Sequence, residues 1–281
     1  MSQRTSQRIA FAILTTLAVI VVVPIVAVVA YIVVQGLGAI SWEFLTDFPR
    51  DGMRQGGILP AVIGTVVLTF GTAVVAIPIA VGAAIYLAEY ARDNWLTRGI
   101  RLAIINLAGI PSVVYGLFGL GLFVLFLGLG TSIVAGSLTL GLMTMPVVIS
   151  TAEEALLTVP QRFRVVSRSL GASQWQTVRS VVLPNALPGI LTGVILGLER
   201  AAGETAPILF TVAAFYLPRL PHSPLDQTMA LPYHLFVIST QVPGMPLEVQ
   251  YGTALVLLIL VLSMNLAATI LRSRFRRRRQ W

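Results

Sequence analysis

Three ionisable residues lie within one long apolar segment of this chain. Glu199, Arg200 and Glu204 interrupt the apolar run of residues 186–213. On membrane-insertion scales, a charged residue at the centre of a spanning helix costs about 2.5–3.5 kcal/mol. Charged groups in such a place must therefore face protein, water or one another rather than lipid. This segment is the first candidate for a functional site.

The arrangement of these charges allows two interpretations. Arg200 and Glu204 are four residues apart, so their side chains can meet on one face of a helix. Either the pair neutralises itself and fixes helix packing, or Arg200 offers its planar guanidinium to a passing oxyanion while the carboxylate sets its geometry. We favour the second interpretation because ionisable residues inside a membrane mark ion and substrate pathways by default. The two interpretations can coexist.

Small residues and a proline surround the charged positions. Gly189, Gly193 and Gly197 recur every four residues, which allows a neighbouring helix to approach closely. Pro207 follows Arg200 by seven residues and weakens the helix at that point. Glycine, proline and charge together indicate a broken helix that lines a cavity.

The composition is that of a protein that crosses the membrane several times. Of the 281 residues, 56% are hydrophobic and only 11% are charged. The absence of cysteine excludes disulfides, thiol catalysis and cysteine-bound zinc. The absence of lysine excludes the Gly-Lys-Ser/Thr end of a nucleotide-binding P-loop, so an ATPase of that type must belong to another chain. We expect no catalytic residue, metal site or cofactor, and an intramembrane hydrolase has little support because no nucleophile–base motif is visible.

Six apolar runs are each able to cross a hydrocarbon core of ~30 Å, which needs about 20 residues in a helix. The runs are residues 9–34, 61–88, 102–127, 133–150, 186–213 and 251–271. The first exceeds the apolar region of a signal peptide, so we expect a transmembrane helix there. The sequence thus predicts an all-α, polytopic membrane protein with six transmembrane helices. We divide it into residues 1–57 with the first helix, a transmembrane domain at 58–271 and a basic tail at 272–281.

Arginine placement predicts the orientation. The segments on one side of the membrane hold most arginines: Arg4, Arg8, Arg92, Arg98, Arg101, Arg162, Arg164, Arg168, Arg179 and those of the tail from Arg272. Arg50, Arg54 and Arg219 fall on the other side. The positive-inside rule therefore places both termini in the cytoplasm. The net charge of +8 flanks membrane spans, so we expect no nucleic-acid partner, and we expect the run Arg276–Arg279 to anchor the topology and attract anionic lipid.

Two segments outside the membrane are long enough to have structure. Residues 215–250 lie outside and are rich in proline, which leaves room for a short interfacial turn at residues 233–238. Residues 151–182 lie inside and predict a helix–glycine–helix elbow. Its signals are a helix start at Pro160, an apolar face with Phe163, Val166 and Leu170, a second face with Arg164 and Arg168, a left-handed end at Gly171, a capping box from Ser173 to Gln176, and termination at Leu183-Pro184. Such an elbow either transmits motion from a docked protein or is an ordinary solvated loop.

The spacing of the elbow resembles a known motif. Gly171, Val181 and Leu183-Pro184 are spaced as in the EAA loop of ABC-importer permeases, although Val165-Val166-Ser167 replaces Glu-Ala-Ala. The resemblance implies that the elbow docks on a separate ATPase subunit. The residues it assigns to this coupling are Arg164, Arg168, Leu170, Gly171, Ala172 and Trp175.

Two further motifs are more specific. Arg200 followed by Gly203-Glu204-Thr205-Ala206-Pro207 is similar to the signature of phosphate-importer permeases of the PstA type. The segment from Gly109 through Pro111-Ser112 and Tyr115-Gly116 resembles the third-helix motif shared by PstA- and PstC-type permeases. The resemblance implies a type I ABC importer fold and a phosphate pathway. The pathway residues are Arg200, Glu204, Glu199, Thr205, Ser112 and Tyr115, with helix packing as the alternative role for Ser112 and Tyr115.

The same resemblance implies an assembly in a bacterial or archaeal cytoplasmic membrane. Its other members are a PstC-type permease, a dimer of PstB-type ATPases and a PstS-type extracytoplasmic phosphate-binding protein. The residues alone indicate an anion, so a permease for sulfate or molybdate is the first alternative. An ion-coupled secondary transporter, with Glu199, Arg200 and Glu204 as a proton relay, is the second.

Overall fold

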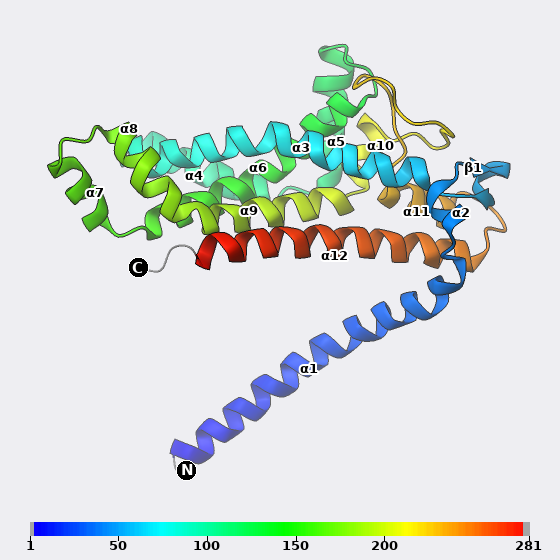
Figure 1. Cartoon of the computed structure of the whole chain (residues 1–281), viewed down its shortest axis with the longest axis horizontal. Coiled ribbons are helices and arrows are strands. Elements are labelled where there is room, and N and C mark those ends of the chain that lie inside the picture. Colours follow the sequence, from blue (N-terminus) through cyan, green and yellow to red (C-terminus); the bar gives the residue numbers. More distant parts are fainter. Residues whose placement is uncertain (1–2, 278–281) are drawn as a thin grey trace.

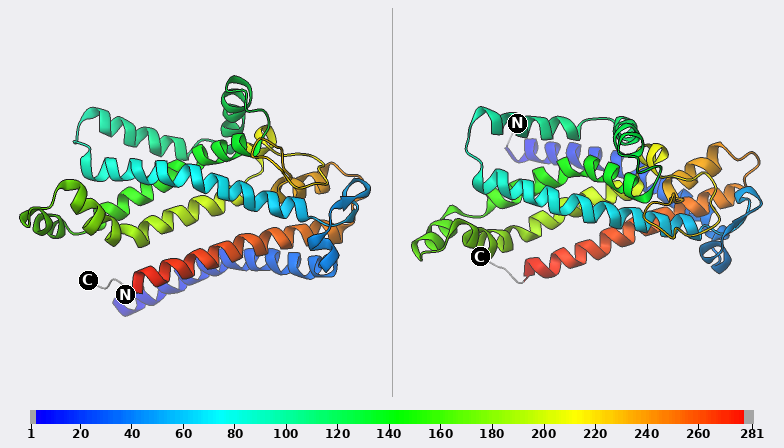
Figure 2. Two further views of the ribbon diagram at one scale, coloured as in Figure 1. Left: turned by 45° about the horizontal axis from the view of Figure 1, so that its top comes forward. Right: turned by 90° about the horizontal axis from the view of Figure 1, so that it is seen from above.

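Long helices form the body of the protein (Figure 1). The structure, a computed structural model, describes residues 3–277. Its long helices are α1 (Gln3–Gly36), α3 (Leu59–Ile85), α6 (Ile133–Thr158), α9 (Leu183–Gly203) and α12 (Leu247–Arg277). Helices α3, α6, α9 and α12 run side by side, whereas α1 diverges from α12 toward its start (Figures 1 and 2). The start of α1 and the end of α12 lie toward the end of the molecule that carries α7 and α8, as a six-span topology requires.

Shorter elements connect these helices. After α1 come a 3₁₀ turn (Leu37–Ala39), α2 (Trp42–Thr46) and the strands β1 (Pro49–Arg50) and β2 (Gln55–Gly56), which pair antiparallel around a second 3₁₀ turn (Asp51–Met53). The others are α4 (Trp95–Ala108), α5 (Ser112–Gly119), α7 (Gln161–Ser169), α8 (Gln174–Thr177), α10 (Ala206–Thr211) and α11 (Leu231–Thr240). Three π-helical segments extend neighbouring helices: Tyr86–Tyr90, Leu120–Phe126 and Val178–Val182. The last two residues of the predicted anchor, Arg278 and Arg279, lie outside the described residues.

The membrane spans differ from the prediction in one place. Five helices are long and apolar enough to cross a membrane within the described residues. The apolar run at 102–127, which Pro111 interrupts, falls within two helices rather than one, Trp95–Ala108 and Ser112–Phe126, which are bent by 103° at this point. Pro111 lacks the N–H of a continuous helix, which explains why the break falls there. Counted as one broken span, this pair brings the number to six.

Helices α3, α6 and α9 make the tightest part of the bundle. The predicted glycine stripe of α9 is confirmed as a close contact with α6, where Gly189, Gly193 and Gly197 face Ala155, Thr151 and Val148. Buried threonines of α3 return their hydroxyls to the carbonyls four residues before, as Thr65 does to Ala61 at 2.8 Å. These hydroxyls are thereby satisfied inside their own helix, as a lipid surrounding demands.

The Pro-rich outer segment is folded onto the bundle. At the start of α6, the N–H groups of Ile133 and Val134 have no acceptor within their own helix. They donate instead to the carbonyls of Asp226 at 2.9 Å and Pro224 at 3.1 Å, respectively. The predicted turn at 233–238 lies within a helix, α11. Its residues include Leu231, Val237 and Ile238, which are fully buried against α3 and α12.

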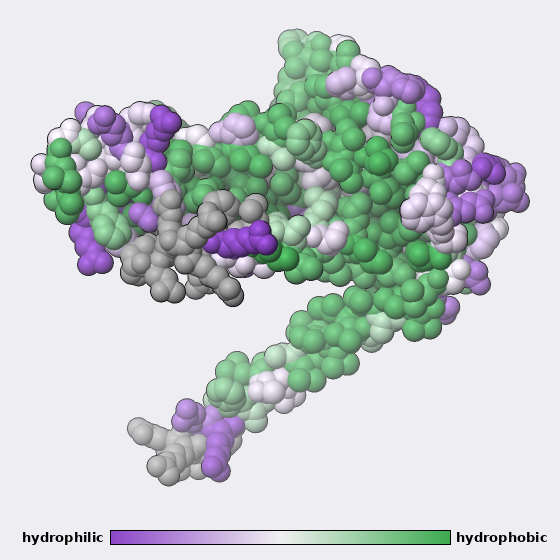
Figure 3. Space-filling view, in the orientation of Figure 1, coloured by the Kyte–Doolittle hydropathy of each residue, from purple (hydrophilic) through white to green (hydrophobic). Residues whose placement is uncertain are grey.

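The surface divides into an apolar middle and two polar ends. Apolar residues cover the middle of the face shown in Figure 3, and hydrophilic residues gather over α7–α8 at one end and over the strands and outer loop at the other. This pattern matches a bundle that crosses a membrane with the elbow on one side and the strands on the other.

Candidate functional site

The charged helix ends where the sequence places its glycine and proline. Helix α9 stops at Gly203, Glu204 is extended with φ −76° and ψ 134°, and α10 begins at Ala206. A continuous helix would pair the carbonyl of Gly203 with the N–H of residue 207, which proline does not have. The predicted break is thus confirmed, while the run 186–213 is two helices rather than one.

Arg200 and Glu204 form the predicted ion pair beside this break. Nε of Arg200 lies 3.2 Å from Oε1 of Glu204, and the two side chains are 40% and 17% exposed. Glu204 also borders a small internal cavity with Thr65 and Thr69 of α3. The terminal nitrogens of Arg200 meet no acceptor within residues 3–277. The carboxylate of Glu204 therefore accepts from Nε of Arg200, and the N–H groups of the two terminal guanidinium nitrogens are free to bind an anion.

The two sequence motifs meet in space. A Cβ on Gly116 of α5 would lie 3.0 Å from both the carbonyl oxygen of Ala206 and the Cα of Pro207, and 2.8 Å from the ring of Phe210. Only glycine allows α5 and α10 to approach this closely. The motif that breaks α9 therefore packs directly against the motif that opens α5, a contact that the sequence did not predict.

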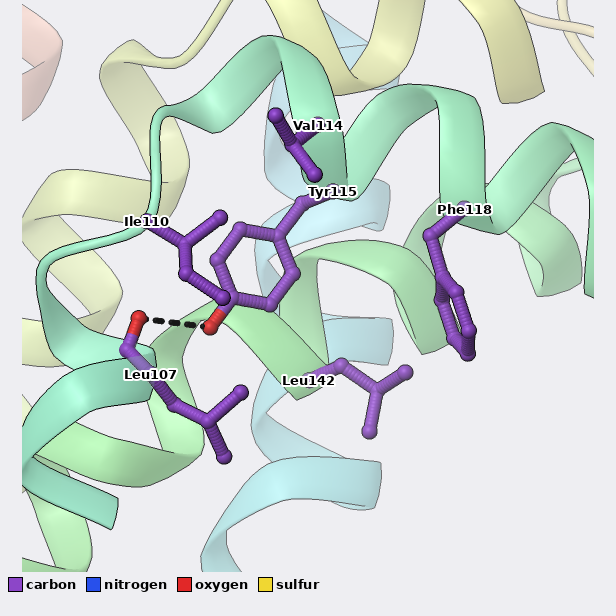
Figure 4. A pocket seen from close by; sticks show the side chains of 6 residues that line it. All are labelled: Leu107, Ile110, Val114, Tyr115, Phe118 and Leu142. Carbon is purple, nitrogen blue, oxygen red and sulfur yellow. Dashed lines mark hydrogen bonds between the residues drawn. The ribbon is translucent and has the colours of Figure 1, made fainter. Parts of the chain in front are cut away.

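Tyr115 holds the bend between α4 and α5 (Figure 4). Its hydroxyl donates to the carbonyl of Leu107 at 2.8 Å, across the interruption at Pro111. The buried ring borders a cavity of about 260 Å³ with Ile110, Val114, Phe118 and Leu142. This hydrogen bond agrees with the packing role for Tyr115, while Ser112 stands partly exposed at the first position of α5.

Glu199 points elsewhere. Its carboxylate borders an apolar cavity of about 210 Å³ between α9 and α12, lined by residues that include Leu198, Met264 and Ala268. One carboxylate oxygen is buried and has no hydrogen-bond partner within the described part of the chain. Adjacent helical positions do not face each other. The structure thus brings Arg200 and Glu204 together and leaves Glu199 on a different face of α9. Thr205 lies at the break between α9 and α10.

The elbow has the caps that the sequence predicted. Helix α7 ends in a Schellman motif, because the N–H of Gly171 donates to Arg168 at 3.0 Å and that of Ala172 to Ser167 at 3.2 Å. Gly171 has the left-handed φ of +84° that this motif requires. Ser173 and Gln176 form both hydrogen bonds of a capping box at the start of α8. These local signals are confirmed.

The prediction that Leu183-Pro184 ends the second helix is wrong. The chain runs as one helix from Gln174 to Gly203, with the π-helical segment just before the proline. The wider π turn accommodates the proline ring, and the side-chain amide of Asn185 donates to the carbonyl of Val181 at 2.8 Å. The second helix of the elbow is therefore continuous with the helix that carries Arg200.

Most of the residues that the resemblance assigns to ATPase coupling are exposed, but Arg164 is buried. Leu170 is 83% exposed, and Val166, Trp175 and Arg168 are also exposed. Arg164, which the resemblance assigns to ATPase coupling together with Arg168, is only 5% exposed and is paired with Glu89. Sequence reasoning missed Glu89, whose only signal was a lone acidic residue at the end of the second apolar run.

Comparison with known proteins finds relatives over most of the chain. Residues 76–280 match the family of binding-protein-dependent transport system inner membrane components. The chain is 34% identical to the probable ABC transporter permease protein YqgI of Bacillus subtilis over 95% of both chains. It is 32% identical to the phosphate transport system permease protein PstA 1 of Mycobacterium tuberculosis, over 99% of this chain and 91% of that one.

Solved structures show the same fold. A bacterial ABC transporter that imports alginate matches with a TM-score of 0.70 at 13% identity, over 96% of this chain and 98% of the other. The MetNI methionine ABC transporter, in an inward-facing conformation, matches with a TM-score of 0.63 at 20% identity, over 78% of this chain and 95% of the other. The chain thus belongs to the family of binding-protein-dependent transport system inner membrane components, the membrane-spanning permease subunits of ABC transporters.

Proposed function

We propose that this chain is the PstA-type permease subunit of an ATP-driven phosphate importer. The observation that carries the proposal is the pairing of Arg200. Its Nε is bound by Glu204, while its two terminal nitrogens have no hydrogen-bond partner within residues 3–277. A relative that aligns over nearly the whole chain is a phosphate transport permease. Phosphate presents several oxygens that a planar guanidinium binds in pairs.

The pairing with Glu204 suits transport rather than storage. An unpaired arginine in a low-dielectric passage would hold a divalent anion tightly. A neighbouring carboxylate reduces this attraction, so that the anion is bound briefly and then released. Arg200 is 40% exposed in this chain alone, which leaves its outer side open to a pathway completed by a second, PstC-type permease.

The elbow supplies the coupling to ATP. Val166, Leu170 and Trp175 form an exposed apolar knob on the end of the molecule that is rich in arginine, and this end is the cytoplasmic one in our proposal. Docked on a PstB-type ATPase dimer, the knob moves with each cycle of nucleotide binding and hydrolysis. A PstS-type binding protein delivers phosphate to the opposite end, which carries the strands and α11.

Reconstitution tests this function. The complex of both permeases and the ATPase is placed in vesicles with phosphate-loaded binding protein, and uptake of radioactive phosphate is followed with and without ATP. Arg200→Ala is expected to abolish uptake while the complex still assembles, and Arg200→Lys to retain part of it, because lysine keeps the charge without the paired donors. Arg98→Ala, which removes an exposed ion pair with Asp93, is the matched control.

The outcomes separate the alternatives. Uptake of sulfate or molybdate in place of phosphate, under the same conditions with the matching binding protein, would assign the chain to another oxyanion. Uptake that follows a pH gradient and persists without ATP would indicate an ion-coupled transporter. Near-normal phosphate uptake by Arg200→Ala would contradict the pathway role of Arg200.

A further inference from the structure

The most buried ion pair among the described residues joins two distant parts of the chain. Nη2 of Arg164 lies 2.6 Å from Oε1 of Glu89, and the side chains are only 6% and 4% exposed. Nε of Arg164 also donates to both oxygens of Glu89, at 3.1 and 3.3 Å. The other ion pairs of residues 3–277 are all more exposed, including Arg101–Glu153 at the same end of the bundle, at 36% and 12%.

Arg164 at the same time closes the end of α6. Its Nη1 donates to the carbonyl of Val159 at 2.5 Å, and its Nη2 to the carbonyl of Leu156 at 2.9 Å. The last carbonyls of a helix have no partner inside the helix and carry the negative end of its dipole. A guanidinium at this position therefore binds both the C-terminal end of α6 and the carboxylate of Glu89.

Glu89 connects α3 and α8 to the same point. It lies in the π-helical segment that ends α3, and its backbone carbonyl accepts a hydrogen bond from the side-chain amide of Gln174 at the start of α8. The hydroxyls of Ser167 and Thr177, 2.9 Å apart, join α7 to α8. The ends of α3 and α6 and the two helices of the elbow thus meet around one buried pair.

The two sides of the elbow are attached to the membrane helices in different ways. From α8 to α9 the chain is one continuous helix, so motion of the elbow reaches α9 directly. Between α6 and α7 stand only Val159 and Pro160, both extended, with ψ values of 125° and 134°. Without a further contact, α7 could rotate about these two residues while α6 stayed in place.

We propose that Arg164 and Glu89 are positioning residues that lock α7 to the inner ends of α3 and α6. Through them, displacement of the elbow moves α3 and α6 together with α9 instead of being lost at residues 159–160. This inference rests on the proposed coupling of the elbow to an ATPase. It makes a buried contact within the permease a determinant of how much substrate is moved for each ATP hydrolysed.

The test compares two glutamates at the same end of the bundle. Glu89→Gln removes the charge that holds Arg164, whereas Glu153→Gln removes the partner of Arg101, which contacts α3 and α6 but not the elbow. In vesicles with the complete complex, phosphate uptake and ATP hydrolysis are measured together. Glu89→Gln is expected to lower the phosphate moved per ATP by about fivefold or more, within the range of allosteric couplings, while hydrolysis continues. Glu153→Gln is expected to leave this ratio unchanged.

A second measurement does not depend on transport. Because the chain has no cysteine, spin labels can be placed on cysteines introduced at the exposed positions Leu157 of α6 and Ser169 of α7. The distance distribution between them is expected to be narrow in the parent complex and broad in Glu89→Gln. Arg164→Lys keeps the charge balance but cannot reach all four acceptors, so it is expected to broaden the distribution as well.

The results distinguish this inference from the proposed function. If the parent complex moves no phosphate, the proposed function fails. The distance distribution between the spin labels then still tests whether Arg164 and Glu89 fix the position of α7. If the parent complex transports while Glu89→Gln keeps both its ratio and a narrow distribution, the lock is refuted. Failure of both Glu89→Gln and Arg164→Lys to assemble would also overturn it, since the pair would then serve folding rather than positioning.

Discussion

Gly193 of α9 lies directly against the hydroxyl of Thr151 of α6. A Cβ built on this glycine would be 1.7 Å from Oγ1 of Thr151 and 2.7 Å from its Cβ, closer than atoms can approach. Rotation of the threonine side chain moves Oγ1 away but leaves its Cβ in place. The distance between the two helices is therefore set by the lack of a side chain at position 193.

This contact predicts that Gly193→Ala destabilises the bundle. Forcing a methyl group into a packed contact costs about 1–3 kcal/mol, because α9 must shift away from α6. The expected result is a lower Tm of the purified protein in detergent. Gly82→Ala is the control, since a Cβ at this position of α3 meets nothing within 4 Å. Equal Tm values for the two variants would mean that the helices separate easily.

Glu204→Gln is expected to change how Arg200 handles the anion. With the neutral amide, Arg200 loses a charged acceptor at 3.2 Å and attracts phosphate more strongly. We therefore expect a lower KM for loaded binding protein together with a lower kcat, because release becomes slower. Initial rates of uptake in vesicles provide both values, with the exposed Glu154→Gln as the control. A rise in KM would indicate that Glu204 serves packing alone.

Gly171→Leu tests the elbow through its backbone. A β-carbon in the left-handed conformation costs roughly 1–2 kcal/mol, so leucine at φ +84° opposes the Schellman motif. The variant is expected to lose copurifying ATPase or to hydrolyse ATP without uptake. Gly171→Asn is the matched control, because asparagine tolerates this conformation. If the leucine variant retains full assembly and coupling, the elbow is only a linker.

Asp226 makes the outer loop sensitive to acid. The backbone N–H of His222, at 2.9 Å, is the main cause that lowers the pKa of this carboxylate, and Ser223 and Arg219 contribute. A group whose pKa is lowered on folding stabilises the fold above its ordinary pKa of about 3.9, and this stabilisation is lost as the pH falls through the folded value. The protection factors for hydrogen exchange of residues 222–226 and of the start of α6, each taken relative to the intrinsic rate at that pH, are thus expected to fall below about pH 4.

Asp226→Asn provides the comparison for this prediction. The amide cannot carry the charge, so protection factors in the same segments should be lower than in the parent protein at neutral pH and should change little on acidification. Exchange of the α7–α8 elbow serves as the internal reference, because it lies at the opposite end of the molecule. An acid response that persists in Asp226→Asn would assign the effect to another group.

Local features of this protein were predictable, and contacts between distant segments were not. The caps at Gly171 and Ser173 depend on hydrogen bonds within a few residues, and the pair Arg200–Glu204 depends on one helical turn. Arg164 and Glu89 are 75 residues apart, so nothing in the sequence pattern brings them together. The helical spacing placed Arg164 and Arg168 on one face, but it did not predict that Arg164 is buried against Glu89 while Arg168 is exposed.

Prolines show why the helix boundaries were only partly predictable. Pro111 interrupts the α4–α5 pair with a bend of 103°, whereas Pro78, Pro146 and Pro188 lie inside helices. At Pro184 a π turn and the amide of Asn185 let the helix continue. A proline removes one hydrogen bond in every case, and the outcome depends on whether another donor replaces it, which is a property of the surrounding structure.

Because the chain is one helix from Gln174 to Gly203, a small tilt of this helix displaces both of its ends. At 1.5 Å per residue, Arg200 lies about 38 Å from Trp175 along the axis of this helix. A tilt of about 5° around its midpoint would displace each end by roughly 1.7 Å, which is about half the present separation of Arg200 and Glu204. Under the proposed coupling to an ATPase, a tilt that begins at the elbow would therefore reach the end of α9 that carries Arg200.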